Sequence, residues 1–133
     1  MAKTVKEILA ERKAKEDADR KRENELWERR RKDEAKQLDE ARDKIAEALD
    51  GFKYTEGGDQ FGRQFKLKFG NRNVYVVYKF ENHEVRYSDD TQPVDVRSLS
   101  IDIGYIINRP SQTTYLEAFP ESFAQFLKRE RLA

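Results

Sequence analysis

Hydrophobic residues are spread very unevenly along this chain of 133 residues. In the first fifty residues they are sparse, and a helical projection at about 100° per residue places most of them on one stripe. At one end of the stripe they follow each other at helical spacing, as Leu38, Ala41, Ile45 and Leu49. Toward the N-terminus charged side chains occupy the stripe over residues 10–25 and leave isolated apolar positions at Val5, Ile8, Leu9, Leu26 and Trp27. The pattern predicts one long helix that docks through residues 38–52.

Both ends of this helix are marked in the sequence. Thr4-Val5-Lys6-Glu7 matches a capping box, in which the Thr side chain accepts a hydrogen bond from the third amide of the helix. Asp50-Gly51 suits the C-terminal end, because Gly adopts the left-handed backbone conformation found there. A helix from about Val5 to Asp50 would be roughly 70 Å long at 1.5 Å per residue, more than the rest of the chain can cover. We therefore expect a projecting charged helical arm over residues 1–37 and a compact domain over residues 38–133.

The second half of the chain alternates apolar and polar residues with a period of two, as half-buried strands do. It predicts strands at about 61–69, 73–80, 84–88 and 94–107, with turns at 70–73 and at Asn82-His83. In the last of these segments the apolar positions change phase near Arg97-Ser98, which predicts a bulge or two short strands. Pro120 suits the start of a final helix at about 119–131. The predicted fold class is α+β, with a long N-terminal charged α-helix that enters the domain over 38–50, a four-stranded antiparallel β-meander and a C-terminal α-helix.

Charge and composition restrict the function. Charged residues make up 40% of the chain, yet the formal net charge is +1, so bulk electrostatic capture of nucleic acid is not indicated. The chain has no cysteine, which suits a reducing compartment. The N-terminus has no apolar signal-peptide core, and no segment approaches the roughly 20 apolar residues of a membrane span. We expect a cytoplasmic protein, in the host cytoplasm if it is encoded by a phage, with no membrane partner.

Catalytic chemistry has little support. His83 is the only histidine, so a His-based zinc site is excluded and a catalytic triad would depend on this one residue. Glu81, Glu84, Asp89 and Asp90 lie close in sequence, but no second ligand-spaced group accompanies them. The glycines match neither a phosphate-binding loop nor a dinucleotide fingerprint. The sequence therefore predicts a protein that is not an enzyme and has no catalytic residues, no metal site and no cofactor.

Two candidate binding surfaces remain. Trp27 is a lone large aromatic in a charged helix, and we expect a partner or a second copy of the chain to bury it, with packing on the domain or simple exposure as the alternatives. The predicted partner-binding residues on the arm are Trp27, Leu26, Arg20, Arg22, Arg29, Arg30, Arg31, Ile8 and Leu9. The outer face of the sheet would present cations around a tyrosine, an arrangement that binds single-stranded nucleic acid or acidic surfaces. The predicted residues of this second surface are Lys66, Lys68, Tyr75, Lys79 and Arg86.

A short stretch resembles a known family. The segments "ALDGFKY" and "DQFGRQFKLKFGN", within residues 48–71, are similar to small phage anti-CRISPR proteins that inhibit Cas9. In one of these a helix-terminal Leu-Asp-Gly-aromatic and a following Phe-Gly join a charged N-terminal arm to a compact α/β domain. The matching positions here are Leu49, Asp50, Gly51, Phe52, Phe61 and Gly62. The resemblance implies a non-enzymatic inhibitor encoded by a mobile element.

Three functional hypotheses follow from the sequence. In the leading one the long helix inserts into a groove of a larger nucleic-acid enzyme or nucleoprotein complex, such as Cas9 with its guide RNA. In the second the chain is a structural or assembly protein that forms a homo-oligomer through its long helix. In the third it binds nucleic acid directly through the basic face of the sheet.

Overall fold

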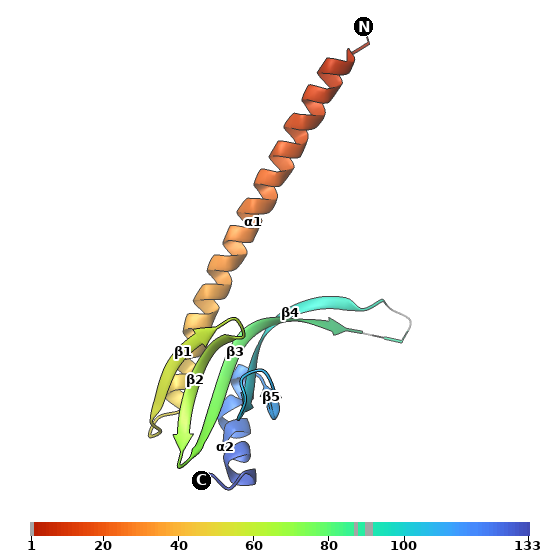
Figure 1. The fold of residues 1–133 in the computed structure, drawn as a ribbon. Coiled ribbons are helices and arrows are strands. Elements are labelled where there is room, and N and C mark those ends of the chain that lie inside the picture. Colours follow the sequence, from red (N-terminus) through yellow and green to blue (C-terminus); the bar gives the residue numbers. More distant parts are fainter. Residues whose placement is uncertain (1, 87, 90–91) are drawn as a thin grey trace. The chain divides into compact units, whose positions relative to one another are not determined.

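The structure, a computed structural model, describes residues 2–86, 88–89 and 92–133 and has an α+β fold (Figure 1). Its contacts divide the chain into two units, Met1–Gln37 and Leu38–Ala133. The elements in chain order are α1 (Val5–Ala48), β1 (Tyr54–Asp59), β2 (Gly62–Phe69), β3 (Arg72–Val85), β4 (Val94–Gly104), β5 (Gln112–Thr114), the 3₁₀ turn η1 (Leu116–Ala118) and α2 (Phe119–Arg129).

The ends of α1 follow the local sequence. The amide of Glu7 donates to Oγ1 of Thr4 over 3.3 Å, which satisfies one of the free amides at the helix N-terminus. The helix ends at Ala48, two residues before the expected Asp50. Gly51 has φ +89°, a conformation that residues with a Cβ rarely adopt, and the next amide donates back to the carbonyl of Leu49 over 3.0 Å. None of the described helices is long and apolar enough to cross a membrane.

The sheet is antiparallel and has five strands in the order β1-β2-β3-β4-β5, so the prediction of four strands is wrong. β1 was missed because its sequence, Tyr-Thr-Glu-Gly-Gly-Asp, lacks apolar alternation, and its pairing with β2 holds it in the sheet. β5 lies between the predicted strand 94–107 and the predicted final helix, where no strand was expected, and β4 ends at Gly104 rather than 107. Ser122 of α2 contacts β5, through its carbonyl to Gln112 and its hydroxyl to Thr114.

The predicted strand 73–80 and the start of the predicted strand 84–88 form one strand, β3, so the turn expected at Asn82-His83 is wrong. Residue 87 of the second prediction lies outside the described residues. β2 covers β3 only as far as Tyr78, and β5 pairs with β4 only from Ile101 to Ile103. Beyond these points β3 and β4 pair only with each other, in a two-stranded extension that we call the ribbon (79–85 and 94–100). Polar residues are tolerated along it because water reaches much of the ribbon, which is why the sequence looked like a turn.

The bulge expected near Arg97-Ser98 is also wrong. The pairing of β3 with β4 is continuous from Val85 opposite Val94 to Tyr75 opposite Gly104. The apolar phase changes because the strand crosses from the ribbon into the body of the sheet. Core burial selects the side-chain face only in the body, where Ile101 and Ile103 are fully buried.

The hydrophobic core lies between one face of the sheet and the two helices. Ala41, Ile45 and Leu49 come from the C-terminal end of α1 and its last turn, and all three are fully buried. Alternate residues of the strands and one face of α2 complete the cluster, namely Phe65, Leu67, Val74, Val76, Tyr78, Ile101, Ile103, Phe119, Phe123, Phe126 and Leu127. α2 covers Phe119–Arg129, close to the predicted 119–131, with Pro120 in its first turn. Among the described residues, no helix covers the other face of the sheet (Figure 1).

Two isoleucines of α1 test whether only the C-terminal end of this helix belongs to the core. Ile45→Ala removes a fully buried side chain and should lower the free energy of unfolding by about 2–5 kcal/mol. Ile8→Ala makes the same chemical change at an exposed position of the same helix and should change it by no more than about 0.5 kcal/mol. Urea unfolding measures both. Losses of equal size would contradict the assigned core.

Candidate functional site

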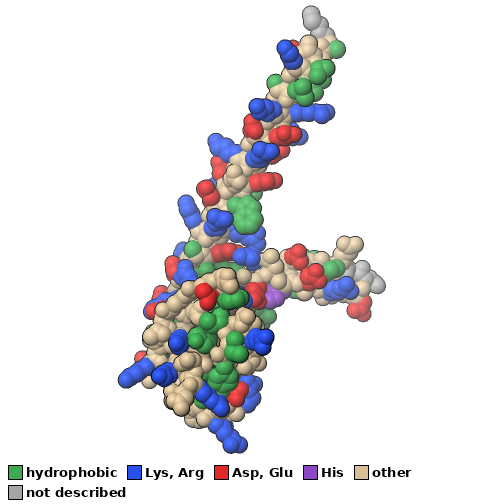
Figure 2. Space-filling model, in the orientation of Figure 1, with side chains coloured by type: hydrophobic (Ala, Val, Ile, Leu, Met, Phe, Trp, Pro, Cys, Tyr) green, Lys and Arg blue, Asp and Glu red, His purple; other side chains and the backbone are tan. Residues whose placement is uncertain are grey.

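The first candidate surface is the arm, which we define as residues 2–37. Every side chain in it is exposed except that of Glu34, which is half-buried. Its large apolar residues include Leu26 and Trp27, which are 64% and 60% exposed, and Val5 and Leu9, which are 72% and 61% exposed. Figure 2 shows green hydrophobic side chains near the N-terminal end of the arm and in a second cluster farther along it. Charged side chains separate the two clusters.

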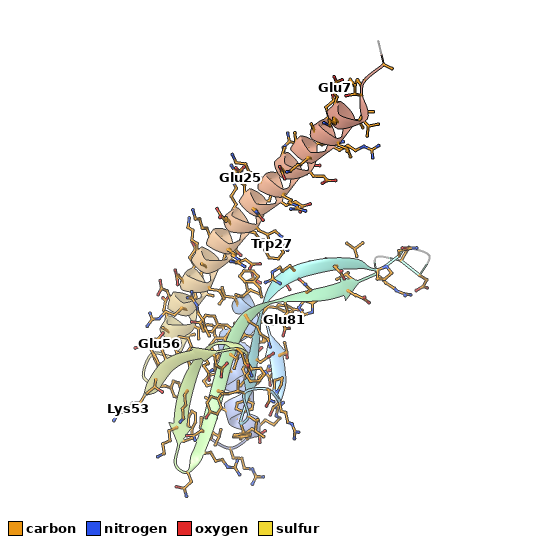
Figure 3. All side chains as sticks on the ribbon, turned by 45° about the horizontal axis from the view of Figure 1, so that its top comes forward. Glu7, Glu25, Trp27, Lys53, Glu56 and Glu81 are labelled. Carbon is orange, nitrogen blue, oxygen red and sulfur yellow. The ribbon has the colours of Figure 1, made fainter. Side chains whose placement is uncertain are left out.

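Trp27 lies beside a small hollow in the helix surface. The hollow has a volume of about 180 Å³ and is lined by Glu23, Leu26, Trp27 and Arg30. These residues recur at positions i, i+3, i+4 and i+7, so they share one helix face. In Figure 3 the side chains of Trp27 and Glu25 leave opposite sides of the helix, as the spacing requires. An aromatic ring flanked by one carboxylate and one guanidinium suits a polar partner with an apolar pocket.

The two apolar clusters of the arm lie on the same helix face. Leu9 precedes Trp27 by 18 residues, which is five complete turns and roughly 27 Å along the helix axis. Ile8 and Leu26 have the same separation. We call these two pairs the arm contacts. A partner would therefore meet apolar contact points five turns apart, with charged side chains between them.

The predicted arginines do not all share that face. Arg30 lines the hollow beside Trp27. By contrast, Arg22 and Arg29 lie roughly 140° and 160° around the helix from Trp27. Arg30 also forms an ion pair with Glu34, at 3.8 Å between Nε and Oε1. Over residues 1–37 the sequence has 13 Lys and Arg against 10 Asp and Glu, a net charge of +3. The arm is therefore moderately basic, and its cations are spread around the helix.

The second candidate surface is the helix-free face of the sheet. In the register of β2 and β3, Lys66 lies opposite Tyr75 and Lys68 lies opposite Asn73. A hollow of about 510 Å³, which we call the basic hollow, opens over these strands. Its lining residues are Lys53, Tyr54, Thr55, Lys66, Lys68, Asn71 and Asn73. Sequence reasoning found Lys66, Lys68 and Tyr75 by alternation, but missed Lys53, Asn71 and Asn73, which depend on the hairpin register and on the turn before β1.

A second hollow, of about 520 Å³, adjoins the first. Arg72, Asn73, Tyr75, Tyr105 and Glu130 line it, so Asn73 belongs to both hollows. The guanidinium of Arg72 lies 5.5 Å from the centre of the Tyr105 ring, within the range of a cation–π contact. Together the two hollows form a surface that combines cations, amides, tyrosines and the carboxylate of Glu130.

Lys79 and Arg86 lie apart from this surface. The Nζ atom of Lys79 lies 2.9 Å from Oε1 of Glu81 and 3.7 Å from Oδ2 of Asp102, so two carboxylates neutralise it. Arg86 follows the end of β3, and eleven residues of extended chain, roughly 36 Å, separate it from Tyr75. Neither residue contributes to a single basic patch with Lys66 and Lys68.

The base of the ribbon carries a polar network around Glu81, which Figure 3 labels on β3. The hydroxyl of Ser100 donates to Oε2 of Glu81 over 3.0 Å, and Nε2 of His83 lies 3.9 Å from the same oxygen. The hydrogen bond from Lys79 is the main reason why the pKa of Glu81 lies below its usual value of 4.5, and the Ser100 hydroxyl adds to the effect. The same hydrogen bond raises the pKa of Lys79. This network stabilises the start of the ribbon.

No family model, curated protein or solved structure matches the chain, so comparison with known proteins does not indicate a function. Within the described residues, no group of three or more His, Cys, Asp or Glu side chains is placed to hold a metal ion. The candidate site therefore consists of two binding surfaces, the arm and the pair of hollows on the sheet.

The Glu81 network makes a pH-dependent contribution to stability. Glu81→Gln should lower the free energy of unfolding by about 1 kcal/mol at neutral pH, because the exchange weakens a partly exposed ion pair and its hydrogen bonds. Since the pKa of Glu81 is lower in the folded chain, the carboxylate stabilises the fold above about pH 4.5. That contribution is lost as the pH falls through the folded pKa, so the stabilities of the variant and the wild type should approach each other as the pH is lowered from about 7 to about 3.

Urea unfolding at the two pH values measures this difference. Glu84→Gln, on the same strand but exposed, serves as the control and should change stability by less than about 0.5 kcal/mol at both. The network would be contradicted if Glu81→Gln lowered the free energy of unfolding by the same amount in acid as at neutral pH.

Proposed function

We propose that this protein is a non-enzymatic binding protein that inserts its helical arm into a groove of a larger partner. The exposure of Trp27 and Leu26 carries the proposal. Burying a large apolar side chain contributes about 1.5–3 kcal/mol, and aromatic residues often dominate the energy of an interface. Neighbouring residues of the arm do not bury these two side chains. The free energy of burying them can therefore contribute to the binding of a partner.

The distribution of charge supports a groove rather than a flat surface. The arm presents cations and anions on all sides and apolar side chains at the arm contacts. A groove lined by both signs of charge can pair with such a helix along its length, whereas a uniformly acidic surface would repel the ten carboxylates. Recognition of a helix through apolar anchors at helical spacing is a recurring mode of peptide binding.

The most specific form of the proposal is an inhibitor of a nucleic-acid enzyme, encoded by a phage or another mobile element. The sequence similarity around Leu49–Phe52 and Phe61-Gly62 to anti-CRISPR proteins supports this form. The partner would then be a nucleoprotein complex such as Cas9 with its guide RNA. The moderate positive charge of the arm suits a groove next to nucleic acid.

Self-association is the second candidate, and the spacing of the arm contacts favours it. In an antiparallel pair of arms centred on residue 18, Leu9 of one copy lies opposite Trp27 of the other. Lys13 and Glu16 then lie opposite Glu23 and Arg20, so neighbouring layers pair opposite charges. Light scattering distinguishes the candidates, because an assembly protein forms a stable dimer or larger oligomer and a groove-binding inhibitor is a monomer.

The direct test uses Trp27→Ala. Purified Cas9 with guide RNA should cleave its target DNA more slowly when the wild-type protein is added. The variant should need about 30-fold more protein for the same inhibition, which corresponds to a loss of about 2 kcal/mol at the interface. Its melting temperature should stay unchanged, because Trp27 is exposed in the free protein.

Glu25→Ala is the matched control, since Glu25 is exposed on the opposite side of the same turn. It should inhibit like the wild type. No inhibition by excess wild-type protein would reject Cas9 as the partner. Full inhibition by Trp27→Ala together with a lowered melting temperature would reject the arm as the binding element.

A further inference from the structure

Several cations of the domain outside the basic hollow are held in ion pairs. Arg42 donates to both carboxylate oxygens of Glu56 at 2.6 and 2.8 Å, Arg63 pairs with Asp39 at 2.6 Å, and Lys79 pairs with Glu81. By contrast, among the described residues no ion pair joins Lys53, Lys66 or Lys68 to a carboxylate. All three are exposed, and no Asp or Glu lines the hollow. The basic hollow is therefore lined by three lysines and by no carboxylate that would neutralise them.

The other lining groups can recognise more than charge. Asn71 and Asn73 offer amide donors and acceptors, and Thr55 offers a hydroxyl. Tyr75 lies opposite Lys66 in the sheet and lines the adjoining hollow together with Tyr105. The two hollows share Asn73, so the lysines of the first lie near Tyr75 of the second, which Glu130 also lines.

We propose that this face binds single-stranded nucleic acid, with Lys53, Lys66 and Lys68 contacting phosphates and Tyr75 stacking on a base. A sheet face that alternates cations and aromatic side chains is suited to single strands, whose unpaired bases expose faces for stacking. A duplex keeps its bases stacked inside and would leave the tyrosine without a role. An acidic peptide would use the lysines but gain nothing comparable from base stacking.

This site is separate from the arm. Every residue assigned to it lies in the unit Leu38–Ala133, whereas the arm contacts lie in the unit Met1–Gln37. Single-strand binding therefore does not require the proposed function, and Trp27→Ala should leave it unchanged. If the partner of the arm is a nucleoprotein, the site would add a contact to its exposed strand.

Fluorescence anisotropy with a labelled thymine oligonucleotide of about 20 nucleotides tests the proposal over about 50–200 mM salt. The logarithm of the binding constant should fall linearly with the logarithm of the salt concentration, by about 0.7 per phosphate contacted. The double variant Lys66→Ala/Lys68→Ala should bind more weakly at low salt, and its slope should be shallower by about 1.4. The control is Lys44→Ala/Lys128→Ala, which removes two exposed helix lysines and the same charge.

Tyr75→Leu tests stacking separately from charge. It should weaken binding by about fivefold or more while the salt slope stays the same, because the phosphate contacts remain. Circular dichroism and the melting temperature confirm that each variant is folded.

Three results would overturn the proposal. The first is no binding of the oligonucleotide at low salt. The second is an equal loss of slope in the control double variant, which would indicate a dependence on net charge alone. The third is competition by poly-glutamate as effective as competition by unlabelled oligonucleotide at equal charge, which would assign the face to acidic proteins.

Discussion

Ala41, Ile45 and Leu49 bury their side chains completely in the core, and this contact makes the rest of α1 possible. Starting a helix is unfavourable, because several residues must be ordered before the first hydrogen bond forms. The docked turns provide that start within the domain. The arm then has only to extend the helix, and its abundance of Ala, Glu, Lys and Arg favours extension. A segment with no core of its own can in this way keep a defined backbone and still offer its side chains to a partner.

Both candidate surfaces are parts of the structure that the core does not cover. The docked end of α1 and α2 cover one face of the sheet, so the opposite face stays open and carries the basic hollow. The arm offers a large aromatic side chain among mixed charges, whereas the hollow offers unpaired lysines beside tyrosines. These are different chemistries, one suited to an apolar pocket in a protein groove and the other to phosphates and bases. The proposed partner class, a nucleoprotein, presents both kinds of chemistry.

The sequence predicted those elements whose apolar side chains enter the core. The docked stripe of α1, β2 and α2 were found close to their observed bounds because burial imposes a regular period on their residues. β1, β5 and the ribbon were missed or divided, since backbone pairing holds them and pairing leaves little trace in composition. The same limit applies to the site. Alternation placed Lys66, Lys68 and Tyr75 on one face, but it could not show that Lys79 is ion-paired, because Asp102, one of its two acidic partners, comes from a neighbouring strand.

In the free protein the arm is exposed to solvent, and Trp27, the only tryptophan of the chain, reports on this exposure directly. Acrylamide quenching of its fluorescence should be measured on the isolated protein, with light scattering on the same sample to establish that it is a monomer. We expect acrylamide to quench Trp27 almost as readily as a free tryptophan derivative, and we expect Trp27 to become shielded when a partner binds. Strong shielding of Trp27 in the isolated monomer would contradict the exposure of the arm.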